Sequence, residues 1–321
     1  MKNSASLILL FFICCCGSAS AQAVPSEDEK IPFLCTFGNK ADIKWGDDDF
    51  VQVFFFAIPE NRKNPFYIRV FDPEISGKYD EERGPNDTKT KFSIYGGKGC
   101  HSDPDAKKSD PKGKYKSSVL LSTNTFANEA KYDNNWYALG PFNPVEGELQ
   151  PENGGYIFKL IVEGLEGNDG NLYKLFLSSE KDNSVKIEGG NAFCYEYTFR
   201  LDDNKGFVSH IYPFIPKGVT TVEINIFDYD NEGMIRTVTV AKKGEITQSE
   251  TEGTWSKTKL TIVKDEINTS MDIQFIKKEP IKNNNVAVNI TNQYGELLPF
   301  YAVPIGGVPK FKYKIGVKKE Q

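Results

Sequence analysis

The stretch that decides the fold is a pair of short apolar segments that occurs twice in the chain. The first copy reads VQVFFFAIP (Val51–Pro59) and then IRVFDPEISG (Ile68–Gly77); the second reads VSHIYPFIP (Val208–Pro216) and then INIFDYDNEG (Ile224–Gly233). In each copy one run ends in Ile-Pro, and the next ends in Phe-Asp with a Gly five residues later. Order and spacing agree, so the repeat predicts tandem domains of one fold, about 150 residues each. Chance likeness of two hairpins is the alternative.

The apolar residues around these segments recur with a period of two, which is typical of half-buried strands. Such strands are expected at residues 67–71, 156–162, 173–177, 220–226 and 286–290, and an edge strand at 310–315. Gly- and Asn-rich turns separate them, and no twelve-residue stretch carries a helical stripe. The pattern predicts an all-β fold of two tandem antiparallel, jelly-roll-like β-sandwich domains.

The N-terminus has the features of a secretory signal peptide. Lys2 precedes an apolar stretch from Leu7 to Cys16, and both Ala19-Ser20-Ala21 and Ala21-Gln22-Ala23 offer a small-x-small cleavage pattern. Ten apolar residues are too few to span a membrane, and no small residue precedes the cysteines as a lipoprotein signal requires. We therefore expect a signal peptide at 1–23, one β-sandwich at 24–183 and a second at 184–321, with no transmembrane segment in the mature chain.

Composition excludes several classes of function. The 321 residues carry 39 basic and 44 acidic side chains for a net charge of −5, and only five of the basic residues are Arg. An acidic, Arg-poor surface does not suit a nucleic-acid partner. Two histidines, His101 and His210, leave little room for multi-histidine metal sites. The mature chain keeps Cys35, Cys100 and Cys194, which allows at most one disulfide or else three buried thiols.

A calcium loop is the most specific chemistry in the sequence. Asp228, Asp230 and Glu232 precede Gly233 in a D-x-D-x-E-G pattern, and Asp72 and Glu74 stand at the matching place in the first copy. Alternating oxygen ligands before a glycine turn suit calcium. The twelfth position of the second loop is Thr239, so this loop is not an EF-hand. An acidic, solvated turn after a strand is the alternative. Calcium is therefore a candidate cofactor, and no other is expected.

Catalysis finds little support in the sequence. Cys100 and His101 are adjacent, and neighbours on a strand point to opposite faces. No G-x-S-x-G, H-E-x-x-H or P-loop motif occurs. We expect no enzyme activity. Four aromatic residues are candidates for a ligand platform, with core packing as the alternative: Trp45, Trp136, Tyr137 and Trp255.

Several sequence segments resemble those of exported proteins of Bacteroidota. They are FFFAIP, PFYIRVFDP, TKTKFSIYGGKG and LPFYAVPIGGVPKFKYKIGVK, beside a signal peptide ending Ala-Gln-Ala. They are similar to a conserved group of two-domain β proteins of the envelope, and in size and all-β character the chain also resembles the plug-like subunit of the type 9 secretion translocon. The resemblance implies a periplasmic protein, with the cell surface as the alternative.

We therefore expect a non-catalytic envelope protein that acts through protein–protein contacts. Its partners would be outer-membrane or periplasmic proteins, among them a secretion translocon barrel, contacted by strand addition or loop insertion. The alternative function is a calcium-stabilised module that binds carbohydrate or peptide.

Overall fold

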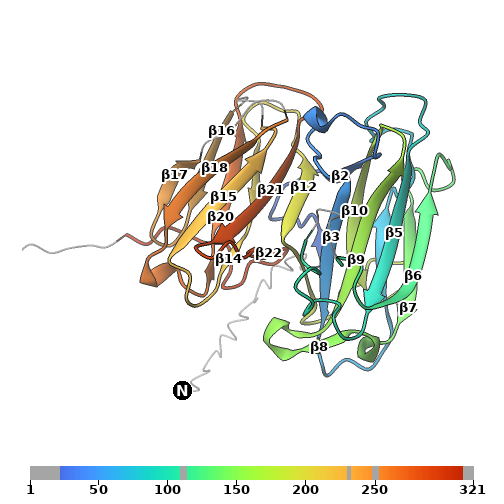
Figure 1. The fold of residues 1–321 in the computed structure, drawn as a ribbon, viewed down its shortest axis with the longest axis horizontal. Helices are drawn as coiled ribbons and strands as arrows, with labels where there is room; N and C mark the ends of the chain where they lie inside the picture. The colour runs from blue at the N-terminus through green and yellow to red at the C-terminus, as the bar shows by residue number, and fades with distance from the viewer. Residues whose placement is uncertain (1–21, 109–113, 230–232, 248–252, 314–321) are drawn as a thin grey trace, which may run out of the picture.

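The computed structural model describes residues 22–108, 114–229, 233–247 and 253–313, and these form an all-β molecule. Two β lobes lie side by side (Figure 1). The predicted strands are present as β4, β9, β10, β15 and β21. The expected edge strand at 310–315 is wrong for its described part, because residues 310–313 join no sheet. Lys312 makes only a single backbone hydrogen bond, to the Val240 carbonyl at 3.0 Å. No helix in the described part of the chain is long and apolar enough to cross a membrane.

The N-terminal half is a sandwich of two four-stranded layers, each of which is part of a larger antiparallel sheet. In spatial order, one consists of β2 (Phe33–Phe37), β10 (Gly170–Ser178), β4 (Phe66–Phe71) and β7 (Trp136–Phe142). The other consists of β3 (Val51–Ile58), β9 (Gly155–Glu166), β5 (Lys89–Gly96) and β6 (Val119–Phe126). Numbered along the chain without the short β1 (Ala23–Val24) and β8 (Glu148–Gln150), the strands follow the orders 1-8-3-6 and 2-7-4-5. This order is that of a jelly roll.

The C-terminal half repeats this order strand for strand. One sheet consists of β12 (Glu196–Arg200), β21 (Asn285–Asn292), β15 (Thr221–Phe227) and β18 (Trp255–Thr261). The other consists of β13 (Val208–Ile211), β20 (Asp272–Lys277), β16 (Gly233–Val238) and β17 (Lys243–Thr247). The repeated sequence segments therefore lie on equivalent strands, β3 with β13 and β4 with β15. The predicted fold class, two tandem jelly-roll-like sandwiches, is confirmed.

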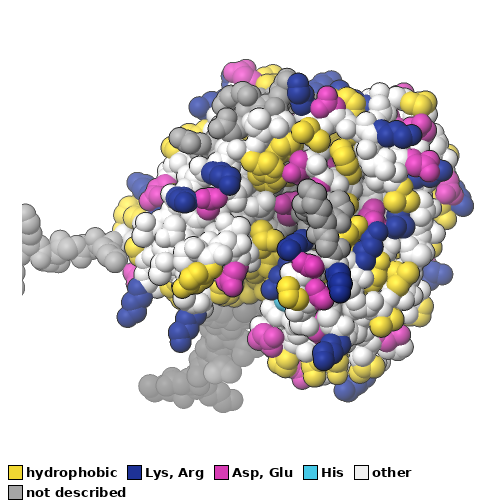
Figure 2. Space-filling model, viewed as in Figure 1, with side chains coloured by type: hydrophobic (Ala, Val, Ile, Leu, Met, Phe, Trp, Pro, Cys, Tyr) yellow, Lys and Arg dark blue, Asp and Glu magenta, His cyan; other side chains and the backbone are white. Residues whose placement is uncertain are grey.

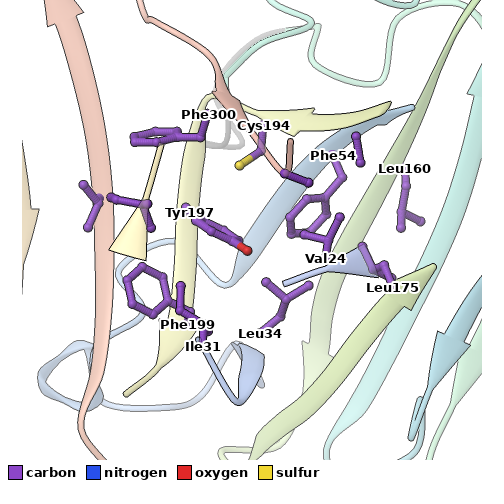
Figure 3. Packing of buried hydrophobic residues seen from close by; sticks show 14 of the residues in the cluster. Val24, Ile31, Leu34, Phe54, Leu160, Leu175, Cys194, Tyr197, Phe199 and Phe300 are labelled. Carbon is purple, nitrogen blue, oxygen red and sulfur yellow. The ribbon is translucent and has the colours of Figure 1, made fainter. Parts of the chain in front are cut away.

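The first strands of the two jelly rolls pair with each other. Leu34 of β2 lies opposite Phe199 of β12, so one sheet of nine strands, β1 included, runs through both halves. Side chains from both strands pack together there with Ile31 and Phe300 (Figure 3). The predicted boundary at 183/184 falls between β10 and β11 (Asn191–Cys194). β11 pairs with β3 and with β22 (Phe300–Tyr301). Two strands that follow the predicted boundary, β11 and β22, therefore belong to a sheet of the N-terminal half. The boundary itself stays a prediction.

Short elements complete the fold. They are β14 (Phe214–Ile215), β19 (Thr269–Ser270) and the 3₁₀ turns η1 (Ile43–Trp45), η2 (Pro144–Glu146), η3 (Pro151–Asn153) and η4 (Lys264–Glu266). The three described cysteines are buried free thiols, which matches the second of the two expectations. Acidic and basic side chains are intermingled over the face seen in Figure 2. The predicted signal peptide lies, up to residue 21, outside the described residues.

Candidate metal centre and the aromatic groove beside it

Three carboxylates from two loops meet at one end of the N-terminal jelly roll. Asp72 and Glu74 follow β4, and Asp133 precedes β7, the strand that pairs with β4. One oxygen from each carboxylate lies within 4.8 Å of the others. The structure thus places the predicted Asp72 and Glu74 together and adds Asp133 as a third ligand candidate.

Asp72 is the most constrained of the three. Its backbone is left-handed (φ 54°), and its side chain is fully buried. Its Oδ1 accepts a hydrogen bond from the Asn134 N–H (3.0 Å), but its Oδ2 has no hydrogen-bond partner within the described part of the chain. Burial raises the pKa of Asp72 to about 7. The negative charges of Asp133 and Glu74 also raise this pKa, whereas the hydrogen bond from Asn134 lowers it. A buried carboxylate oxygen without a donor costs free energy that a bound cation would offset.

Glu74 adds a second buried carboxylate. Its Oε2 accepts hydrogen bonds from the Glu129 N–H and the Ser76 hydroxyl, both at 3.0 Å, and burial raises its pKa. Among the described residues, no Lys or Arg forms an ion pair with Asp72, Glu74 or Asp133. Three carboxylates without a positive partner form a hard-oxygen site of the kind that suits calcium.

Asp80 and Gly77 shape the loop around the site. Asp80 accepts hydrogen bonds from the N–H groups of Ser76 (2.7 Å) and Leu172 (2.6 Å), which tie the loop to β10. Gly77 is left-handed (φ 77°), and a Cβ there would collide with the Asp133 carboxylate. Gly77 is therefore favoured by its left-handed backbone, and a larger residue there would displace the Asp133 side chain.

Of the three ligand candidates in the second predicted loop, Asp228 is the one that the structure describes. This residue is buried and left-handed (φ 62°), and its Oδ1 accepts a hydrogen bond from the Gly253 N–H at 2.6 Å. Asp230 and Glu232 lie outside the described residues, so calcium binding there stays a prediction. A further acidic turn, residues 47–49, is hydrogen-bonded to other parts of the protein. Asp47 accepts hydrogen bonds from the Phe37 and Phe50 N–H groups, and Asp48 accepts one from Trp255 Nε1.

A groove lies beside the three carboxylates, on the strands that carry them. Its volume is about 410 Å³, and Arg69, Trp136, Tyr137, Ala138, Gly140, Lys181 and Asp182 line it. Trp136 is 37% exposed, although its ring also packs on Phe71 at 5.3 Å and Phe176 at 6.4 Å. The Arg69 guanidinium lies 4.9 Å from the centre of the Trp136 ring. Trp136 thus combines core packing with access to a ligand.

The other tryptophans are engaged in packing. Trp45 lies against Phe37 at 5.9 Å and under the guanidinium of Arg83 at 4.5 Å. Trp255 packs on Phe227 at 5.3 Å, and its Nε1 is bonded to Asp48. Of the aromatic candidates, Trp136 and Tyr137 are the two that line the groove.

Cys100 and His101 point to different partners. Cys100 Sγ donates to the Tyr95 and Ile157 carbonyls at 3.5 and 3.6 Å, whereas the His101 ring is bonded to Gln150 and Tyr195. Burial raises the pKa of Cys100 to about 12 and lowers that of His101 to about 4. A thiolate–imidazolium pair is therefore not favoured here.

Sequence reasoning missed Asp133 and Arg69. Asp133 stands 61 residues after Asp72, and only the pairing of β4 with β7 brings the two together. Its one sequence signal is the Asp-Asn-Asn turn before Trp136, which matches the start of a strand. Arg69 lies on a strand that reads as ordinary alternation, so nothing local marks it.

No protein-family model and no curated protein sequence matches the chain. Similar solved structures include chains of viral particles. The cowpea mosaic virus top component aligns over 97% of this chain and 98% of that chain, at 10% identity and a TM-score of 0.23. A Penaeus vannamei nodavirus aligns over 94% of both chains, at 10% identity and a TM-score of 0.18. Likenesses this weak carry no argument about this protein.

Proposed function

We propose that this protein is a calcium-stabilised binding module without catalysis of its own. The observation that carries the proposal is the fully buried Asp72 Oδ2, which has no hydrogen-bond donor and belongs to a cluster of three carboxylates. Calcium would bridge the loop after β4 to the loop before β7. Cys100 and His101, with diverging side chains, offer no support for nucleophilic catalysis.

A calcium site of low affinity fits the compartment in which we expect the protein. The predicted signal peptide indicates the periplasm, with the cell surface as the alternative. Calcium modules that work outside the cytosol bind with Kd of about 10⁻⁴–10⁻³ M. Three carboxylates in a partly preformed loop fit that range.

Thermal unfolding with calcium and with EDTA tests the proposal. At calcium ten times above Kd, the gain in stability is about 1.4 kcal/mol, which raises Tm by about 2 °C in a chain of this size. Asp133→Asn should abolish the increase while leaving the EDTA-treated protein folded, because Asp133 is only half-buried. The matched control is Asp203→Asn, an exposed acid in the other half that should keep the full increase. A wild-type Tm that responds to neither calcium nor EDTA would refute the proposal.

A second candidate function is contact with an envelope protein, such as a translocon barrel. It is favoured by β6, an edge strand of its sheet, where Val119 and Leu120 are 61% and 49% exposed. Exposed apolar side chains on an unpaired strand edge favour strand addition. Affinity purification in mild detergent from the native host tests this idea. We expect one outer-membrane partner with the wild type and its loss with Val119→Lys, and equal recovery with both proteins would argue against β6.

A further inference from the structure

We propose that the groove beside the metal centre binds an acidic sugar, with Arg69 holding the sugar carboxylate and Trp136 contacting its ring. The proposal rests on the proposed function, for which it names a class of ligand. It depends on the calcium centre only for the position of Trp136. The groove's size is that of a small-molecule site rather than of a protein interface.

Arg69 is a buried positive charge without a carboxylate partner. The residue is 5% exposed, and its guanidinium donates to the Ser184 hydroxyl (2.5 Å) and the Asp182 carbonyl (3.1 Å). Its Nε has no hydrogen-bond partner, and it makes no ion pair among the described residues. Its hydrogen bonds go to neutral oxygens, and the Asp182 charge acts on it from beyond ion-pair distance, so an anionic ligand in contact with the guanidinium would lower the cost of burying this charge.

The charges that line the groove favour an anion. Lys181 adds a second positive charge, and the Asp182 carboxylate, although it also lines the groove, is exposed and lies beyond ion-pair distance of Arg69. A planar carboxylate fits the guanidinium fork in two parallel hydrogen bonds. A carboxylate is therefore an anion that matches the guanidinium in shape.

One aromatic side chain favours a ring-shaped ligand. Trp136 presents exposed indole next to Arg69, whereas the ring of the following residue, Tyr137, packs on Phe126 at 5.0 Å. An apolar ring beside hydrogen-bonding groups suits a sugar, which has an apolar C–H face and polar edges.

An extended peptide fits less well. β7 is an edge strand of its sheet, so a peptide would add there by backbone pairing. Pro141 interrupts that edge because it has no N–H to donate. A uronic acid is therefore the ligand class that the groove favours.

The calcium centre and the groove share a short piece of backbone. Asp72 accepts from the Asn134 N–H and donates its own N–H to the Asn135 carbonyl (2.9 Å), immediately before Trp136. Calcium bound to Asp72 and Asp133 would hold this turn, and with it the indole ring. Sugar affinity should therefore fall when calcium is removed.

The test follows the indole N–H signals of the three tryptophans by NMR during titration with methyl glucuronide. Trp136→Phe assigns the Trp136 signal, and the Trp255 signal is an internal reference, since its Nε1 is bonded to Asp48. The matched neutral probe is methyl glucoside, which has CH₂OH in place of the carboxylate. We expect the Trp136 signal to shift with the uronide and an affinity about 10- to 100-fold weaker for the glucoside.

Variants separate this proposal from the calcium centre. Arg69→Met should lose uronide binding and keep the calcium-induced rise in Tm, and the exposed Lys181→Met should weaken uronide binding without affecting folding. The control Lys217→Met removes an exposed positive charge from the other half and should change neither. Equal affinity for the two sugars, no shift of the Trp136 signal, or displacement of the uronide by an acidic peptide at lower concentration would overturn the proposal. Full uronide binding in EDTA would overturn its link to calcium alone.

Discussion

Phe71 and Phe227 occupy the same place in the two jelly rolls. Each lies opposite a tryptophan on the neighbouring strand, Trp136 or Trp255, with ring centroids 5.3 Å apart in both cases. Each is followed by a buried left-handed aspartate that caps the turn before that tryptophan. The repeated Phe-Asp is thus one structural device used twice, and the halves differ in what surrounds it.

The metal-free protein should lose stability as pH rises. The pKa of Asp72 is about 7 in the folded state and 3.8 ordinarily, so the folded state binds the proton more tightly. The stabilisation is present in full below pH ~4 and is lost as pH rises to ~7, by about 2–4 kcal/mol. Calcium needs the ionised carboxylates, so its effect on Tm should grow over the same range.

Melting curves from pH 5 to 8, in EDTA and in calcium, test this pH dependence. Asp72→Asn should make the decline in EDTA smaller, leaving the part that Glu29 causes, and should abolish the calcium effect. A calcium effect as large at pH 5 as at pH 8 would contradict the role of Asp72.

Gly77→Ala should destabilise the loop that carries the site. The residue needs a left-handed backbone, and the added Cβ would displace Asp133. We expect a loss of about 1–3 kcal/mol, measured by denaturant unfolding, together with weaker calcium binding. Gly206→Ala is the control: its backbone is also left-handed, but the Cβ would meet nothing within 4 Å. If the two variants lose the same stability, closeness to Asp133 has no effect.

Arg200→Met should weaken the connection between the two halves. Arg200 of β12 forms an ion pair with Glu81, which is fully buried at its side chain and is also bonded by Arg83. Loss of one partner from a buried pair costs about 3 kcal/mol. Chemical denaturation measures the loss. Lys205→Met, which removes a surface lysine, should cost under about 0.5 kcal/mol. Similar losses for both variants would contradict a structural role for the pair.

Glu29→Gln should stabilise the protein at alkaline pH. Burial raises the pKa of Glu29 to about 8, although the Ser26 N–H and the Tyr197 hydroxyl both bond its carboxylate. Wild-type stability should fall as pH rises from ~4.5 to ~8, on the order of 4 kcal/mol. Glutamine keeps an acceptor oxygen and does not ionise, so the melting temperature of the variant should fall less than that of the wild type over this range, leaving the smaller decline that Asp72 causes. A parallel decline in both proteins would show that Glu29 does not titrate as expected.

Much of the architecture follows from local pattern. Alternating apolar residues place β4, β9, β10, β15 and β21, because a strand with one buried face must repeat every two residues. The same rule failed at residues 310–313, where alternation occurs without a neighbouring strand to pair with. Alternation therefore marks strand propensity, whereas pairing needs a partner strand.

The candidate site shows the same division. The all-β class, the repeat and the pair Asp72 and Glu74 follow from the sequence, since these depend on period and spacing along one segment. That Asp133 joins them, that Arg69 lies over Trp136 and that β2 pairs with β12 follows from the three-dimensional arrangement of the strands. In a jelly roll, neighbours in a sheet are distant in the chain, so pairing, and with it every site built across two strands, is set by packing of the whole fold.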